Sequence, residues 1–272
     1  MNKTRRKAGL KRRAQRALER QLSYQQQKAN SIRGRESAMI AKMIESSRAA
    51  RQFLSQFRSI DDDARVLEVG SGAHGLIFFF GARYGIGIDP LAHSYISLFP
   101  EWQRKVPTIT AVGESLPFAD QSFEFVLCDN VVDHAESPAR IVAELVRVLS
   151  PGGLLYFTVN IHHPIYALVS SAHAAWNGLG IKFELAPFAD HTFHLTPHTV
   201  NRIFIDKSLR VLKETNYIEA ARVLAHQRAP RHLGDRLKRV FFKNALYELV
   251  AIKEDPIAKS NERSTEPLLP DS

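Results

Sequence analysis

Three glycines in the spacing G-x-G-x-x-G follow directly after an apolar run. The stretch "RVLEVGSGAHG" covers residues 65–75, and its glycines are Gly70, Gly72 and Gly75. An apolar strand that leads into such a loop is typical of the first βαβ unit of a nucleotide-binding sheet. The loop alone leaves three alternatives open, because it can hold a pyrophosphate, hold a nucleoside without phosphates, or serve as a plain turn.

The chain after this loop alternates between apolar strands and helical segments. We expect strands at residues 65–70, 85–90, 106–113, 122–130 and 154–160, followed by two closing strands at 217–227 and 245–253. Segments 75–84, 137–153 and 196–214 are predicted helices, and Ser137 and Thr196 are placed to cap the last two. Strands that are apolar almost throughout indicate a mostly parallel α/β sheet of seven strands with helices on both faces.

Composition divides the rest of the chain into segments. Residues 1–28 are basic and then glutamine-rich, which predicts a flexible arm, and residues 29–60 form a helical extension. Residues 61–255 are the main domain, in which an insert rich in histidine and aromatic residues spans 161–195. Residues 256–272 are polar with three prolines, and we expect a disordered tail.

The net charge of +9 is concentrated at one end of the chain. Residues 1–20 hold nine Lys or Arg and only one acid, so the remainder is close to neutral. This arm can contact nucleic acid or an anionic surface, or it can be a solvated tail. No apolar run is long enough for a transmembrane segment or a signal peptide, and Cys128 is the only cysteine, so we expect a cytoplasmic protein in a reducing compartment.

Two acids bear on what the glycine loop holds. Asp89 ends the second strand, where a carboxylate can accept hydrogen bonds from both ribose hydroxyls of a nucleoside. Glu68 lies two residues before Gly70, where its charge would repel a pyrophosphate and suit a ligand that carries an ammonium group, directly or through water. These residues favour an adenosyl amino acid over a dinucleotide.

A later segment, residues 113–123, reads "GESLPFADQSF", and the helix after the fourth strand ends in Pro-Gly-Gly. With these motifs in this order, residues 65–160 resemble the class I S-adenosylmethionine-dependent methyltransferases, in particular the group with a Glu-x-Leu-Pro-Phe segment. A looser resemblance continues to Lys253. It implies a Rossmann-like, doubly wound fold with S-adenosylmethionine as the cofactor.

The resemblance also implies roles for individual residues. Gly70, Ser71 and Gly72 would lie behind the methionine part of the cofactor, with Glu68 near its ammonium group. The remaining candidate cofactor residues are Asp89 for the ribose, Pro90 beside the adenine, Gly113 with its N–H toward the adenine, Glu114 and Asn130. One departure from many relatives is Val112, which stands where they carry an Asp or Asn that accepts from the adenine amino group.

The methyl acceptor should lie at the ends of the fourth and fifth strands. His134 and His163 are the candidate general bases there, because an imidazole titrates near neutral pH. The chain lacks the Asn/Asp-Pro-Pro-Tyr/Phe segment typical of enzymes that methylate adenine bases or amides, and no histidine spacing predicts a metal site.

We expect methyl transfer to oxygen or nitrogen of a small organic acceptor, such as a sugar, natural-product or quinone-type precursor. The alternatives are an RNA methyltransferase recruited by the basic arm and a silent cofactor-binding module.

Overall fold

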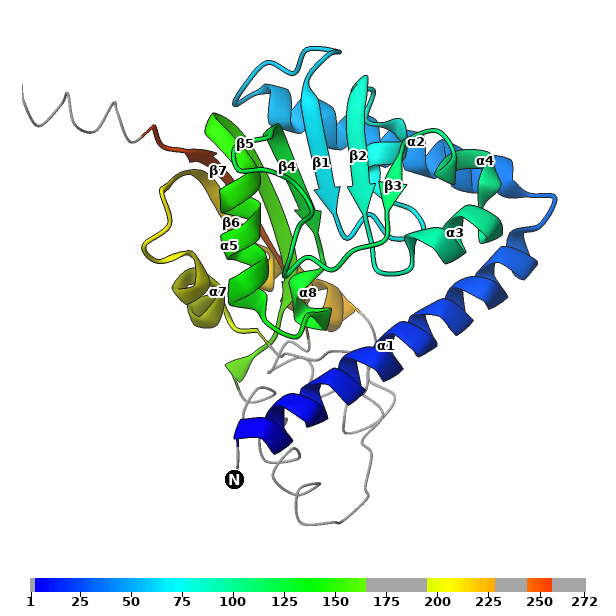
Figure 1. Ribbon diagram of the computed structural model, residues 1–272, viewed down its shortest axis with the longest axis horizontal. Helices are drawn as coiled ribbons and strands as arrows, with labels where there is room; N and C mark the ends of the chain where they lie inside the picture. The colour runs from blue at the N-terminus through cyan, green and yellow to red at the C-terminus, as the bar shows by residue number, and fades with distance from the viewer. Residues whose placement is uncertain (1–2, 165–194, 228–243, 256–272) are drawn as a thin grey trace, which may run out of the picture.

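A computed structural model describes residues 3–164, 195–227 and 244–255, which form a seven-stranded sheet covered by helices (Figure 1). The strand order is β3-β2-β1-β4-β5-β7-β6. Strands β1 to β5 are parallel, and β7 runs antiparallel between β5 and β6. The strands are β1 (Arg65–Val69), β2 (Tyr84–Ile88), β3 (Thr108–Ile109), β4 (Phe123–Asp129), β5 (Leu149–Ile161), β6 (Leu209–Asn216) and β7 (Ala245–Lys253). The predicted fold class is confirmed.

Helices lie on both faces of the sheet, and each face has its own apolar core. Val66 and Leu67 are neighbours on β1 and fall into different cores, because side chains alternate between the faces of a strand. The core with Leu67 contains residues of α5 and α7, and the core with Val66 contains residues of α2, α3 and α4. The helices are α1 (Lys3–Ile32), α2 (Glu36–Ser55), α3 (Ala92–Leu98), α4 (Pro100–Gln103), α5 (Pro138–Val148), α7 (Pro197–Phe204) and α8 (Ile218–Gln227), with 3-10 turns η1 (Leu76–Phe79) and η2 (Val132–His134).

Several predicted elements are wrong in extent or type. The strand expected over 106–113 is only β3, and the helix expected over 137–153 ends at Val148, so that the Pro-Gly-Gly segment lies inside β5. The helix expected over 75–84 is only η1, after which the chain turns at Gly81, with φ of +80°, into β2. The helix expected over 196–214 ends with α7, because the chain turns near Asp206, with φ of +59°, and continues as β6. The strand expected over 217–227 is helix α8. The prediction is wrong because it takes Val223 and Leu224 as buried strand residues, whereas both are exposed.

The N-terminal part is more ordered than its composition suggested. Helix α1 is continuous over 30 residues, so the boundary expected at residue 28 between a flexible arm and a helical extension falls inside a helix. Figure 1 shows α1 crossing below the carboxyl ends of β1, β2 and β3, beside α3. Most of the 161–195 insert and the 256–272 tail lie outside the described residues. None of the described helices is both long and apolar enough to span a bilayer.

Candidate cofactor site at the carboxyl edge of the sheet

The glycine loop is a tight turn tied to the end of β2. The N–H groups of Gly70 and Ser71 both donate to the Ile88 carbonyl, at 2.7 and 2.9 Å. Gly70 has φ of +75°, and a Cβ there would lie 2.3 Å from Val131 Cγ2. Only glycine fits that position, because a side chain would be strained and would also overlap with its neighbour.

Gly72 differs from Gly70, since its α-carbon faces open space. Its φ is +53°, but a Cβ built there would meet no atom closer than the Gly70 carbonyl at 3.8 Å, and Asp89 Oδ2 would lie at 4.0 Å. The backbone at Gly72 therefore leaves room for a ligand directly beside a carboxylate.

Asp89 follows β2 and is held by two backbone N–H groups. Oδ2 accepts from Gly72 at 3.1 Å and Oδ1 accepts from Leu91 at 2.7 Å. A carboxylate offers about four lone-pair positions, so both oxygens can still accept from a ligand. Burial raises the pKa of Asp89 to about 6, although the two backbone hydrogen bonds lower it again in part. The group is thus mostly ionised at neutral pH and becomes protonated in mild acid.

Glu68 is placed differently from what the sequence suggested. Its side chain is buried, and its two oxygens accept from the N–H groups of Leu76 and Ile77 at 3.0 and 2.9 Å. A Cβ at Gly75 would lie 2.3 Å from Glu68 Oε2, so the third glycine of the motif makes room for this carboxylate. Burial raises the pKa of Glu68 to about 8. Glu68 thereby fixes the turn from the loop into η1.

Glu114 also uses its carboxylate within the chain. Its Oε1 accepts from the N–H groups of Glu136 and Ser137 at 2.8 and 3.2 Å, and these groups precede α5. The predicted cap by the Ser137 side chain is wrong, because that side chain makes no capping bond. Gly113 is buried where a Cβ would lie 3.1 Å from both Val69 and Ile141, so this position brings the loop close to β1 and α5.

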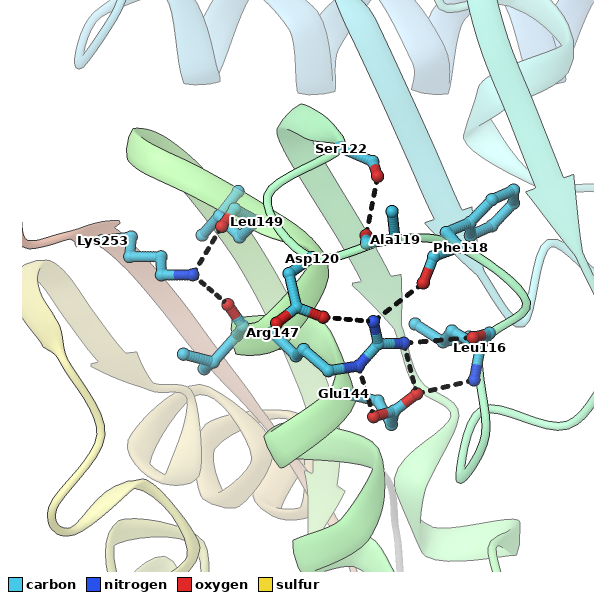
Figure 2. Close-up of polar contacts among 10 residues, drawn as sticks. Leu116, Phe118, Ala119, Asp120, Ser122, Glu144, Arg147, Leu149 and Lys253 are labelled. Carbon is cyan, nitrogen blue, oxygen red and sulfur yellow. Dashed lines mark hydrogen bonds and ion pairs between the residues drawn. The ribbon is translucent and has the colours of Figure 1, made fainter.

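The Glu-x-Leu-Pro-Phe loop is fixed from α5 by Arg147 (Figure 2). The Arg147 guanidinium donates to the carbonyls of Leu116 and Phe118 at 3.0 and 2.8 Å. It also pairs with Asp120 at 2.8 Å and with Glu144 at 2.7 Å. One side chain therefore holds both ends of the loop segment 116–120 against the helix.

The ends of β4 and β5 are joined through Asn130. Its Oδ1 accepts from the Asn160 backbone and side-chain amides at 3.0 and 2.7 Å, and its φ is +56°. His134 closes η2, which packs against β5, and His163 follows the end of β5 and is half-buried. The structure thus brings the elements that carry both candidate bases to the carboxyl ends of β4 and β5.

The residues present fit an adenosyl ligand. Asp89 has unused acceptor capacity beside the open face of Gly72, and Pro90 next to it is half-buried. Val112, with 47% of its surface exposed, follows β3, the strand that pairs with β2. Among residues 3–164, 195–227 and 244–255, no group of three or more His, Cys, Asp or Glu side chains is arranged to hold a metal ion.

Comparison with known proteins agrees with this geometry. The methyltransferase domain family matches residues 67–157, from β1 to β5. Residues 67–157 are therefore a methyltransferase domain, with the Rossmann-like fold of the class I S-adenosylmethionine-dependent enzymes. An uncharacterized methyltransferase of Mycobacterium leprae is 34% identical over 100 residues, and an uncharacterized protein of Methanocaldococcus jannaschii is 35% identical over 89 residues. These matches cover 35% and 33% of this chain, and only 37% and 41% of the two relatives.

Solved structures extend the similarity of the fold beyond this segment. Geranyl diphosphate C-methyltransferase from Streptomyces coelicolor, solved with S-adenosylhomocysteine, aligns with a TM-score of 0.55 at 14% identity, covering 80% of this chain and 83% of its own. The YcgJ protein of Bacillus subtilis aligns with a TM-score of 0.53 at 16% identity, covering 76% of this chain and 99% of its own. At such identities the likeness establishes the methyltransferase fold.

Two residues of the site had no signal in the sequence. Gln103 is buried on α4, and its Nε2 donates to the carbonyls of Gly72 and Ala73 at 3.0 and 3.1 Å. The neighbouring Trp102 donates through Nε1 to the same Ala73 carbonyl at 2.7 Å. Both hold the glycine loop from about 30 positions away, where no local motif marks them.

Proposed function

We propose that this chain transfers a methyl group from S-adenosylmethionine to oxygen or nitrogen of a small organic molecule. The observation that carries the proposal is the Asp89 carboxylate, held at the open face of the glycine loop by the Gly72 N–H. The matched methyltransferase domain supports the choice of cofactor. S-adenosylmethionine, when bound, supplies the methyl group already activated on its sulfonium.

Each part of the carboxyl edge has a role in this proposal. Asp89 accepts from the ribose hydroxyls, while Gly72 and Ser71 form the wall beside the methionine part. Gly113 and Pro90 bound the adenine, and the exposed apolar side chain of Val112 can pack against its ring. Glu68 and Glu114 act indirectly, because they hold η1 and the start of α5.

The acceptor belongs on the side of β4 and β5. Asn130 keeps the two strand ends in register, and His134 or His163 removes the proton of the accepting hydroxyl or amine. The protein must mainly align the acceptor and exclude water, because the methyl donor is already activated. We propose that residues 161–195 form part of the acceptor pocket.

A transfer assay tests this proposal. Purified protein is incubated with methyl-tritiated S-adenosylmethionine and an extract separated into small molecules, RNA and protein. We expect label in the small-molecule fraction, and we expect it to disappear with Asp89→Ala. Label found only in RNA would overturn the choice of acceptor, and the absence of label from all fractions would favour a silent cofactor-binding module.

The RNA alternative depends on the basic segment of α1. Removing residues 1–28 would not test it cleanly, because that deletion also takes away the part of α1 that packs near α3. Glutamine substitutions restricted to the basic residues within 3–13 are the better test. A small-molecule enzyme should keep its turnover in this variant, whereas an RNA enzyme should lose affinity, most strongly at low salt.

A further inference from the structure

Helix α1 separates its arginines from its lysines. At about 3.6 residues per turn, all the arginine positions of residues 3–20 fall within about 120° of the helix circumference. These positions, which we call the arginine face, are Arg5, Arg6, Arg12, Arg13, Arg16 and Arg20. The lysine positions of the same stretch are 3, 7 and 11, and their spacing of four puts them on the opposite side. Either residue would serve for solubility, so this separation indicates a role that depends on arginine.

The arginine face is the outer side of α1. On the inner side of the helix, Leu18 and Leu22 are half-buried and Gln25 is buried. Arg16 and Arg20 lie on the other side and are exposed. At about 1.5 Å per residue, the arginine face extends for about 22 Å along the axis. Figure 1 shows α1 as one straight helix along the outside of the molecule, with its N-terminal end leading away from α3.

The charges of the arginine face call for an anionic partner. Arg12, Arg16 and Arg20 follow one another at intervals of four, a spacing at which like charges destabilise a helix. Glu19 is the only acid among the first 35 residues, so the segment itself supplies little compensation. Arginine suits phosphate in particular, because its planar guanidinium donates two parallel hydrogen bonds that a lysine ammonium cannot reproduce. A row of arginines on a straight helix therefore fits a partner with several phosphates.

An exposed aromatic side chain adjoins this row. Tyr24 is 57% exposed and lies one helical turn beyond Arg20. A shallow hollow of about 410 Å³ at this place is lined by Arg16, Glu19, Arg20, Ser23, Tyr24 and Gln27. An exposed ring beside arginines can stack on an unpaired base, whereas the bases of a duplex are already stacked on one another. The Gln27 amide offers both a donor and an acceptor, which match a 2′-hydroxyl group.

We infer that the outer face of α1 binds single-stranded RNA, with arginines on successive phosphates and Tyr24 stacked on a base. An anionic membrane fits this face less well, because a helix that lies in a membrane surface carries bulky apolar side chains beside its basic ones. Leu18 and Leu22 are on the inner side, and Tyr24 is the only aromatic residue of α1. This inference goes beyond the proposed function, since RNA is here a docking partner and the methyl acceptor remains a small molecule.

Fluorescence anisotropy of the full chain with a labelled single-stranded RNA of about 12 nucleotides tests the inference. One triple variant neutralises a row of the arginine face, and its matched control removes the same charge at the same spacing from the opposite side. The changes are Arg12→Gln, Arg16→Gln and Arg20→Gln in the variant, and Lys3→Gln, Lys7→Gln and Lys11→Gln in the control. We expect the arginine variant to bind RNA at least tenfold more weakly and the lysine control to stay within threefold of the parent. The slope of log K against log salt should be shallower by about 2 in the arginine variant.

Two further changes test the chemistry of the contact. Tyr24→Leu keeps an apolar side chain but removes the ring, so we expect RNA to bind at least fivefold more weakly, while the exposed neighbour change Gln26→Ala should have no effect. Arg16→Lys with Arg20→Lys keeps the charge but loses the paired hydrogen bonds, so it should still weaken RNA about threefold. DNA of the same sequence should bind at least threefold more weakly than RNA, and equal binding would overturn the choice of RNA.

Controls separate this inference from folding and from the proposed function. The changed residues with described side chains are exposed, so melting temperatures should match the parent. S-adenosylhomocysteine should bind all variants equally, and a parent that binds it but no RNA would overturn only the role of α1. Equal losses in the arginine variant and the lysine control would show non-specific charge attraction and overturn the inference. Tighter binding to vesicles of phosphatidylcholine and phosphatidylserine than to RNA would overturn it in favour of a membrane.

Discussion

The Asp89 carboxylate accepts a hydrogen bond from the Gly72 N–H at 3.1 Å, so the end of β2 is joined to the glycine loop that follows β1. Gly72 and Asp89 lie just after β1 and β2, which are neighbouring parallel strands whose carboxyl ends meet at one edge of the sheet. This contact places a carboxylate with unused acceptor capacity beside an open stretch of backbone, which is the arrangement that a ribose needs.

Asp89→Ala should abolish most cofactor binding. The change removes the acceptor for the ribose and also the bond that orients Gly72, so we expect S-adenosylhomocysteine to bind at least tenfold more weakly in calorimetry. Asp63→Ala is the matched control, because Asp63 is an exposed acid just before β1, and it should bind like the parent. Equal affinity of the two variants would contradict the assignment of Asp89.

Exchanging Gly70 and Gly72 for alanine should give two different defects. At Gly72 the only destabilising effect of alanine is its positive φ, which lowers the free energy of unfolding by about 1–2 kcal/mol. Its methyl group enters the ligand space, so cofactor binding should fall tenfold while the protein stays folded. At Gly70 the alanine also overlaps with Val131, so the melting temperature should fall much further. Thermal melts and titrations on both variants check this order, and a reversed order would show that the open side of the loop is misplaced.

Glu68→Gln should change how stability depends on pH. Burial raises the pKa of Glu68 to about 8 from an ordinary value of 4.5, so the folded state holds a proton that the unfolded state releases. The carboxyl group should therefore cost the parent stability as the pH rises from about 4.5 to 8. Glutamine cannot ionise, so the parent-minus-variant difference in melting temperature should decline across that range. A flat difference would mean that Glu68 is ionised at neutral pH.

Arg147→Ala should loosen the Glu-x-Leu-Pro-Phe loop. It removes charged hydrogen bonds to the Leu116 and Phe118 carbonyls and the pairs with Asp120 and Glu144, and we expect a loss of about 1–3 kcal/mol in the free energy of unfolding. Arg140→Ala on the same helix removes one long bond of 3.4 Å and should cost little. Urea unfolding of both variants measures the difference, and similar losses would argue against the loop-holding role.

The sequence predicted the strands well wherever one apolar run ended in a recognisable turn. The strand before Gly70 and the acid at Asp89 were found because their spacing follows from the geometry of a parallel sheet. Helix α8 was predicted as a strand because its apolar residues Val223 and Leu224 were taken to be buried, although both are exposed. The pattern of apolar residues predicts the type of element correctly only where those side chains are buried.

The candidate site was predicted less completely than the fold. Glu68 was assigned to a ligand, but its partners are the N–H groups of Leu76 and Ile77, which a motif cannot reveal. Gln103 was missed altogether, because it reaches the loop from helix α4 through tertiary packing. A sequence motif describes the residues of one loop, whereas the side chains that form a binding site come from several elements. A motif therefore predicts only part of the site.

The most direct test of the central claim is calorimetric titration of the full chain with S-adenosylmethionine, S-adenosylhomocysteine and NAD. The account predicts that both adenosyl amino acids bind at a single site and that NAD does not, because the Gly72 and Asp89 edge fits an adenosine and residues 67–157 match the methyltransferase domain family. Binding of NAD alone, or of none of the three, would contradict it.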